Sequence, residues 1–128
     1  MPRGLHEMKR PNETIVDYRP WGNFKRYCLN EPVTVKIIAL NPGQSLSVQK
    51  HKNRDELWIA LDGSIVAELN GETIGLGMGG ELWIPRGSVH SASNRHYHQS
   101  RLLEVAFGTF DEEDITRLSD KYGRVKNG

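Results

Sequence analysis

The chain has 128 residues, a formal net charge of +1, 37% hydrophobic residues and 26% charged residues. This length fits one domain that buries its own core. The balanced charge gives no bulk attraction to nucleic acid or to a membrane surface, so neither is expected as a partner. The single cysteine, Cys28, excludes an internal disulfide and a cysteine-rich zinc module.

The sequence carries no signal for export or membrane insertion. No apolar run is long enough for a transmembrane helix, and residues 1–7 lack the apolar stretch of a secretory signal. A lone thiol is typical of a reducing compartment. We therefore expect a cytoplasmic protein.

The N-terminal residues differ from the rest of the chain. Residues 1–13 are polar and without periodicity, which predicts a poorly ordered arm or an added strand ahead of one domain over residues 14–124. Arg19-Pro20-Trp21-Gly22 is typical of an extended turn, because the residue before a proline avoids the helical region. Trp21, like Trp58 and Trp83, is expected in the core.

Short β-type runs alternate with turn residues through the middle of the chain. Asp62-Gly63 and Asn70-Gly71 are hairpin signals between successive runs. Many short strands with turns between them predict an all-β barrel or sandwich. The expected strands cover residues 33–40, 46–51, 56–61, 64–69, 81–84, 89–93 and 102–107.

The C-terminal residues show a different pattern. Thr109 and Glu112 have the spacing of a capping box, in which Thr109 caps the first turn of a helix. Ile115, Leu118 and Tyr122 then fall on one helical stripe, and the following glycine is a typical helix stop. These residues predict a short C-terminal helix packed on the barrel.

Four polar residues have the spacing of a metal site. Gln49 and His51 share one face of a strand, and Glu56 begins the next strand after a short loop. His90 follows the tight turn Pro85-Arg86-Gly87 and begins a later strand. Each side chain alone has an ordinary surface interpretation, but together they predict one divalent ion. Two imidazoles, a carboxylate and an amide oxygen suit zinc, iron, manganese, cobalt or nickel, and ligand chemistry alone does not choose among these ions. Zinc is the first expectation, with cobalt, manganese, nickel, iron and magnesium as alternatives.

Two stretches resemble the paired motifs of the cupin superfamily. Residues 43–63 match the first motif, with Gln49 in place of the usual first histidine, and residues 80–94 match the second. The Gln49 form resembles the type II mannose-6-phosphate isomerase cupin, and this resemblance extends over residues 14–124. It is carried by Arg19-Pro20-Trp21-Gly22, Leu46–His51, Arg54–Trp58, Leu103–Val105, Glu113–Arg117 and Tyr122-Gly123-Arg124. One departure is Arg95–His98, where the family usually has a Pro-Gly turn.

The resemblance implies a cupin fold, a double-stranded β-helix or jelly-roll barrel, and a metal-dependent isomerase. Such an enzyme interconverts mannose 6-phosphate and fructose 6-phosphate through a cis-enediol. The catalytic base is Glu104 or Glu56, between which spacing does not choose. Arg54 is expected to stabilise the enediolate or to bind phosphate. Further phosphate-binding candidates are Lys36, Arg19 and Arg124.

Alternatives to this isomerase stay open at the level of sequence. Another metal-dependent cupin enzyme would be a different sugar-phosphate isomerase or an oxygenase. A non-catalytic sugar-binding cupin module would bind its ligand without turnover. The family often fuses this domain to a GDP-mannose pyrophosphorylase, and we expect here a free-standing isomerase domain. By analogy with barrels that pair across their sheets, a homodimer is expected.

Overall fold

A computed structural model describes residues 14–124 and shows an all-β architecture. The expected arm over residues 1–13 lies outside the described residues. No helix that could cross a membrane occurs between residues 14 and 124. The strands are β1 (Ile15–Arg19), β2 (Gly22–Arg26), β3 (Val33–Leu40), β4 (Val48–Lys50), β5 (Arg54–Ala60), β6 (Ile65–Leu69), β7 (Glu72–Leu76), β8 (Glu81–Ile84), β9 (His90–Asn94), β10 (Ser100–Gly108) and β11 (Thr116–Ser119).

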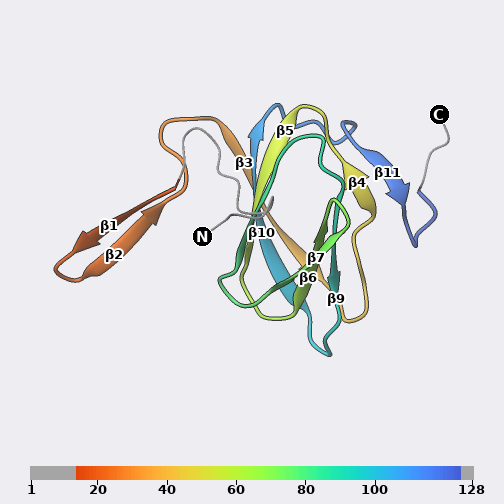
Figure 1. The fold of residues 1–128 in the computed structure, drawn as a ribbon, viewed down its shortest axis with the longest axis horizontal. Helices are drawn as coiled ribbons and strands as arrows, with labels where there is room; N and C mark the ends of the chain where they lie inside the picture. The colour runs from red at the N-terminus through yellow and green to blue at the C-terminus, as the bar shows by residue number, and fades with distance from the viewer. Residues whose placement is uncertain (1–13, 125–128) are drawn as a thin grey trace.

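Two antiparallel sheets form the barrel (Figure 1). One sheet has the strand order β3-β10-β5-β8, and the other has the order β11-β4-β9-β6-β7. The chain passes repeatedly from one sheet to the other, so that both sheets contain strands from distant parts of the sequence. This arrangement confirms the all-β cupin fold. The predicted strand over residues 33–40 has the bounds of β3, and that over 81–84 has the bounds of β8.

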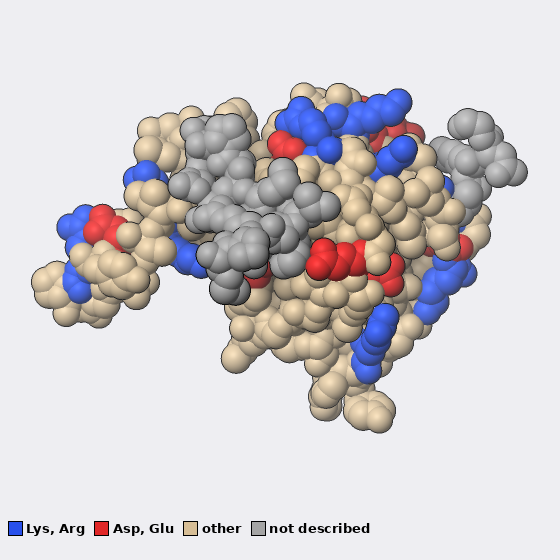
Figure 2. All heavy atoms as spheres, in the orientation of Figure 1, with Lys and Arg blue, Asp and Glu red and all other residues tan. Residues whose placement is uncertain are grey.

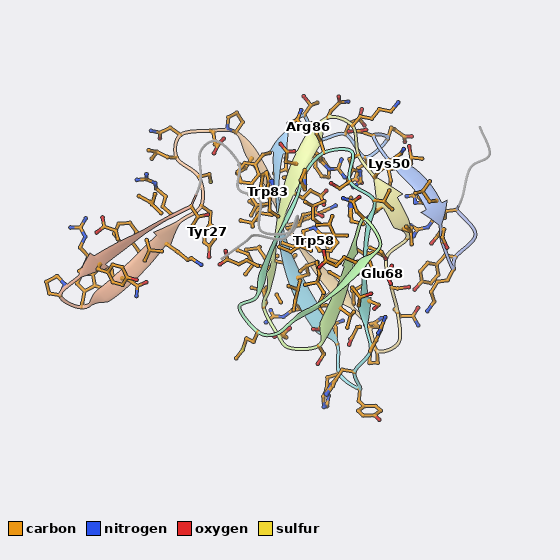
Figure 3. The ribbon with its side chains drawn as sticks, viewed as in Figure 1. Tyr27, Lys50, Trp58, Glu68, Trp83 and Arg86 are labelled. Carbon is orange, nitrogen blue, oxygen red and sulfur yellow. The ribbon has the colours of Figure 1, made fainter. Side chains whose placement is uncertain are left out.

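The hydrophobic core lies between the two sheets. Strand alternation turns every second residue inward, and Trp58 and Leu102 have no exposed surface at all. Figure 3 shows Trp58 inside the barrel. The apolar part of this core is built from Leu40, Trp58, Ala60, Ile65, Ala67, Leu69, Leu76, Leu82, Ile84, Ala92 and Leu102.

A β-hairpin projects from the barrel (Figure 1). Its strands β1 and β2 pair only with each other among the described residues, and their turn lies at Pro20 and Trp21. The turn confirms the prediction for Arg19-Pro20-Trp21-Gly22. The expectation that Trp21 lies in the core is wrong, since its side chain is 73% exposed at the hairpin tip.

The predicted C-terminal helix is wrong. The carboxylate of Asp114 accepts hydrogen bonds of 2.9 Å from the backbone N–H groups of Lys52 and Asn53, which holds this segment against the barrel. Residues after Asp114 then form β11, which pairs with β4. A short isolated helix is marginal in water, whereas the open edge of β4 offers backbone partners that β11 satisfies.

One of the two hairpin signals is also wrong. Asn70-Gly71 joins β6 to β7 as a hairpin, and both residues have the positive φ of a type I′ turn, 49° and 85°. Asp62-Gly63 instead carries the chain from β5 in one sheet to β6 in the other. The Asp62 carboxylate accepts hydrogen bonds from Arg101 on β10, so the aspartate fixes the connection between β5 and β6 against β10.

Candidate metal centre and its pocket

Three predicted ligand residues meet inside the barrel. His51 follows β4, Glu56 lies on β5 and His90 begins β9, and one ligand atom of each lies within 4.8 Å of the others. Their exposed fractions are 3%, 1% and 1%. Spacing places them correctly because Glu56 and Trp58 share the inner face of β5, and His90 lies across from Gln49 in the neighbouring strand.

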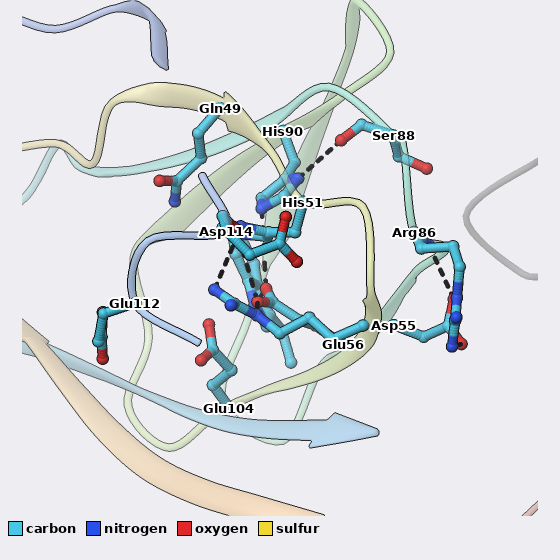
Figure 4. A network of polar contacts seen from close by, with 12 residues as sticks. Gln49, His51, Asp55, Glu56, Arg86, Ser88, His90, Glu104, Glu112 and Asp114 are labelled. Atoms are coloured by element: carbon cyan, nitrogen blue, oxygen red, sulfur yellow. Dashed lines mark hydrogen bonds and ion pairs between the residues drawn. The ribbon is translucent and has the colours of Figure 1, made fainter. Parts of the chain in front are cut away.

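Backbone carbonyls fix the orientation of both imidazoles (Figure 4). Nδ1 of His51 lies 2.7 Å from the carbonyl oxygen of Asp114, and Nδ1 of His90 lies 2.9 Å from that of Ser88. A carbonyl only accepts, so each Nδ1 carries the proton and each Nε2 presents a lone pair. These Nε2 atoms lie 3.4 Å and 3.7 Å from the carboxylate of Glu56.

The donor set fits a divalent ion. Nε2 of His90 is buried and has no hydrogen-bond partner among the described residues, although a buried polar atom normally has one. Burial lowers the pKa of His51, and it lowers the pKa of His90 to about 4. Both imidazoles are therefore neutral at neutral pH, which is the form that binds a metal.

Arg54 and Trp58 hold the carboxylate of Glu56. Nε of Arg54 donates to Oε2 at 2.9 Å, and the indole N–H of Trp58 donates to Oε1 at 3.1 Å. Nη2 of Arg54 also donates to Nε2 of His51 at 3.2 Å. The guanidinium is 4% exposed and lies 4.3 Å from the centre of the Phe110 ring. Arg54 is thus a buried cation in direct contact with two of the three candidate ligand residues.

Glu104 brings a second carboxyl group to the cluster. It lies on β10 directly across from Lys36 on β3, and Nζ of Lys36 is 3.4 Å from its Oε2. Figure 4 shows its carboxyl group pointing toward the cluster around Glu56. Burial, reinforced by the negative charge of Glu56, raises the pKa of Glu104 to about 7. At neutral pH this carboxyl group can both accept and release a proton.

A pocket of about 190 Å³ opens onto this cluster. Its lining combines candidate ligands, the Glu104 carboxyl group and several cations, which suits a small polar anion. Figure 2 shows further Lys and Arg side chains gathered at one end of the barrel. Among the residues that line the pocket are Lys36, Gln49, His51, Arg54, Glu104, Arg117 and Arg124.

Comparison with known proteins identifies the family. The family model described as "Mannose-6-phosphate isomerase C-terminal" matches residues 6–120. The chain belongs to this family. It is 37% identical over 123 residues to the mannose-1-phosphate guanylyltransferase ManC of Salmonella typhimurium, covering 95% of this chain and 25% of that protein. It is 36% identical over 109 residues to the alginate biosynthesis protein AlgA of Pseudomonas aeruginosa, covering 84% of this chain and 23% of AlgA. The chain thus spans about a quarter of the length of these relatives.

Solved structures support the fold. The capsular polysaccharide assembling protein CapF of Staphylococcus aureus superposes with a TM-score of 0.60 at 18% identity, over 84% of this chain and 34% of CapF. A predicted oxalate decarboxylase from Thermotoga maritima superposes with a TM-score of 0.56 at 25% identity. That match covers 59% of this chain and 65% of the other.

Of the other site residues that the family resemblance implies, some line the pocket and one lies away from it. Lys36 and Arg124 line the pocket, and Arg124 also forms an ion pair of 2.7 Å with Asp120. Arg19 lies on the projecting hairpin, exposed and paired with Asp17 at 3.0 Å, and does not line the pocket. Gln49 lines the pocket and accepts a hydrogen bond of 3.1 Å from Ser47. Its role as a fourth ligand stays a prediction.

Sequence reasoning missed the contribution of the chain's own C-terminal segment, residues 109–119, to this site. Phe110 packs on Arg54, Asp114 binds His51 through its carbonyl, and Arg117 lines the pocket. The helix prediction hid these roles, since it assigned the segment to the outside of the barrel. Gly108 would have been a signal of close approach: its φ is +110°, and a Cβ there would lie 2.6 Å from the carbonyl oxygen of Asn53.

Proposed function

We propose that this chain is a metal-dependent sugar-phosphate isomerase that interconverts mannose 6-phosphate and fructose 6-phosphate. The observation that carries the proposal is Glu104, a carboxyl group with a pKa of about 7 beside a His–Glu–His cluster in a cation-lined pocket. Membership of the isomerase family supports it. The guanylyltransferase activity named for the longer relatives is not proposed for this chain.

Glu104 is the proposed base. Conversion of the aldose to the ketose removes the proton on C2, forms a cis-enediol and returns a proton to C1, while the hydroxyl proton on O2 is lost and O1 gains one. A carboxyl group whose pKa lies near the working pH performs both transfers. Both oxygens of Glu56, the other candidate, already accept hydrogen bonds from Arg54 and Trp58. That arrangement favours Glu104.

Negative charge develops on the sugar oxygens as the proton leaves. A divalent ion, with zinc favoured, held by His51, Glu56 and His90 with Gln49 as a fourth ligand, would supply Lewis-acid stabilisation of that charge. The buried guanidinium of Arg54 provides a fixed positive charge beside the same position. Lys36 and Arg124 are proposed to attract the substrate phosphate into the pocket.

A coupled assay tests the proposal. Purified chain is incubated with mannose 6-phosphate, and fructose 6-phosphate is measured after chelation and after separate addition of zinc, cobalt, manganese, nickel, iron and magnesium. We expect product with at least one ion and none with chelator. Absence of product with every ion would overturn the isomerase assignment. Turnover of glucose 6-phosphate alone, or consumption of oxygen, would indicate another cupin enzyme. Binding of mannose 6-phosphate without turnover would indicate a sugar-binding module.

The homodimer remains a proposal, and apolar side chains outside the barrel support it. The hairpin exposes Tyr18 and Trp21, and Val35 and Ile37 on the edge strand β3 are each 56% exposed. An isolated two-stranded hairpin has little stability of its own, and such apolar surface is typical of a contact between subunits. A cytoplasmic location is likewise proposed.

A further inference from the structure

Arg117 on β11 lines the pocket, and its charge has no partner among the described residues. Its Nε is buried and has no hydrogen bond, and no ion pair or side-chain hydrogen bond of Arg117 occurs within residues 14–124. The other basic pocket residues are engaged: Arg54 with Glu56, Lys36 with Glu104 and Arg124 with Asp120. The Arg117 side chain is partly exposed, but its Nε is buried without an acceptor. Because such a buried donor is costly, we expect an external acceptor to complete it.

Strand pairing places Arg117 in line with the metal centre. Arg117 lies directly across from Gln49 in the β11–β4 pair, and Gln49 lies directly across from His90 in the β4–β9 pair. Directly paired residues point to the same face of a sheet, so the three side chains form one row on the inner face. Neighbouring strands lie about 4.8 Å apart, so the backbones of Arg117 and His90 are separated by about 10 Å.

We propose that Arg117 binds the phosphate group of a sugar phosphate whose reacting carbons lie at the cluster of His51, Glu56 and His90. The planar guanidinium presents two parallel N–H groups to two phosphate oxygens, a geometry that a lysine does not reproduce. The carbon chain of a hexose can bridge the distance between Arg117 at one end of this row and His90 at the other. The inference rests on the proposed isomerase function and adds to it the residue that selects a phosphorylated substrate.

The pocket's acidic residues do not cancel this charge. Glu112 lines the same pocket, but its side chain is 78% exposed and lies 4.0 Å from Lys36. Glu104 is likewise next to Lys36 and near Glu56 rather than paired with Arg117. Arg117 therefore remains available to an incoming dianion.

The test compares binding with turnover in three variants of the chain. Arg117→Gln removes the charge. Arg117→Lys keeps the charge but lacks the two parallel N–H groups of the guanidinium. Arg86→Gln is the control. Arg86 is an exposed arginine that pairs with Asp55 and is absent from the pocket lining. Thermal unfolding of each variant establishes that it is folded. Calorimetry then measures binding of inorganic phosphate, mannose 6-phosphate and unphosphorylated mannose to the chelator-treated protein.

We expect Arg117→Gln to weaken binding of phosphate and mannose 6-phosphate roughly tenfold to a hundredfold, the range of one or two charge-assisted hydrogen bonds. Mannose binding should stay unchanged, Arg117→Lys should recover part of the loss, and Arg86→Gln should match the wild type. With metal added, KM for mannose 6-phosphate should rise in Arg117→Gln while kcat stays near the wild-type value.

Equal phosphate affinity in Arg117→Gln and wild type would overturn the inference, as would an equal loss of mannose and mannose 6-phosphate binding. Failure of the isomerase proposal gives a different result. In that case Arg117-dependent binding of mannose 6-phosphate persists without turnover under any metal, and the phosphate site stands without the reaction.

Discussion

The guanidinium of Arg54 donates from Nε to Oε2 of Glu56 at 2.9 Å, inside the barrel and beside both candidate metal-binding histidines. Its Nη2 donates to Nε2 of His51 at 3.2 Å, the lone pair with which that histidine would bind a metal. One lone pair serves one partner at a time. Arg54 and a divalent cation therefore compete for His51, and their like charges repel each other in a buried site.

Replacement of Arg54 by methionine should strengthen metal binding. The metal-free variant should lose about 3 kcal/mol of stability, because Glu56 is then buried without its cation. Saturating zinc should raise its Tm by more than it raises the wild-type Tm, since the ion supplies the missing positive charge. Differential scanning fluorimetry across a zinc titration measures both effects. Arg86→Met, which removes an exposed arginine paired with Asp55, should leave the zinc-dependent shift at the wild-type value. Weaker zinc binding in Arg54→Met would contradict the competition.

Substitution of either histidine should remove the metal without unfolding the barrel. His51→Ala and His90→Ala each delete one of three buried candidate ligands. The metal content, measured by inductively coupled plasma mass spectrometry, should therefore fall well below one ion per chain. Circular dichroism should retain the β-sheet spectrum. The control is His96→Ala, which changes an exposed histidine in the loop after β9. Wild-type metal content in both ligand variants would refute the site.

Strand alternation explains why the ligand cluster could be predicted from sequence. A residue's face on a strand follows from its position, so the spacing of His51 and Glu56 and the turn before His90 predicted that these three candidate ligands lie together. Gln49 lies across from His90 in the neighbouring strand. The tight turn at Asn70-Gly71 was predictable for another local reason, since asparagine and glycine tolerate the positive φ that a type I′ turn requires. The contact of Arg54 with the Phe110 ring instead joins residues far apart in the chain, and no local pattern contains it.

The C-terminal segment shows where local signals fail. Thr109 and Glu112 have helix-capping spacing, yet the backbone N–H of Thr109 donates to the carbonyl of Asn53. This segment forms a strand because the edge of β4 is open for pairing, and the segment's own sequence contains no information about that edge. The projecting hairpin is a similar case, since the exposed position of Arg19 follows from the path of the chain and not from its neighbours.

Asp114 should link the C-terminal segment to metal affinity. Its carboxylate accepts from Lys52 and Asn53, and its carbonyl oxygen orients His51. We expect Asp114→Ala to lower stability by about 2 kcal/mol and to weaken zinc binding roughly tenfold, because the carbonyl loses its fixed position. Chemical unfolding and competition with a zinc chelator measure the two quantities. Asp120→Ala, which removes the ion-pair partner of Arg124, should leave zinc affinity unchanged. Wild-type zinc affinity in Asp114→Ala would show that the segment does not orient His51.

The hairpin tip should contribute to self-association. Trp21→Ser removes an indole ring from a residue that is 73% exposed. The variant should therefore sediment less as a dimer and more as a monomer. Tyr97→Ser is the matched control, since Tyr97 is 89% exposed in the loop after β9. Its sedimentation should equal that of the wild type. A wild-type chain that sediments as a monomer at all accessible concentrations would exclude the dimer.

Glu104 should make the stability of the metal-free protein depend on pH. Burial and the charge of Glu56 raise its pKa from 4.5 to about 7, while Lys36 and Arg54 act in the opposite direction. A raised pKa means that the folded state binds the proton more tightly than the unfolded state does. The resulting stability is fully present below pH 4.5 and is lost as pH rises through about 7, at about 1.4 kcal/mol for each pKa unit.

Glu104→Gln isolates this contribution. The lowered pKa values of His51 and His90 act in the opposite direction, favouring the fold above their unfolded pKa near 6.5. Burial is the largest cause of both shifts and is retained in the variant, so this burial contribution cancels in the difference. With chelator present, the free energy of unfolding of the wild type minus that of Glu104→Gln should therefore fall between pH 4.5 and pH 8. Urea unfolding at several pH values measures the difference. A difference that is constant with pH, or one that rises, would show that Glu104 has no raised pKa in the folded protein and would remove the main support for its role as the base.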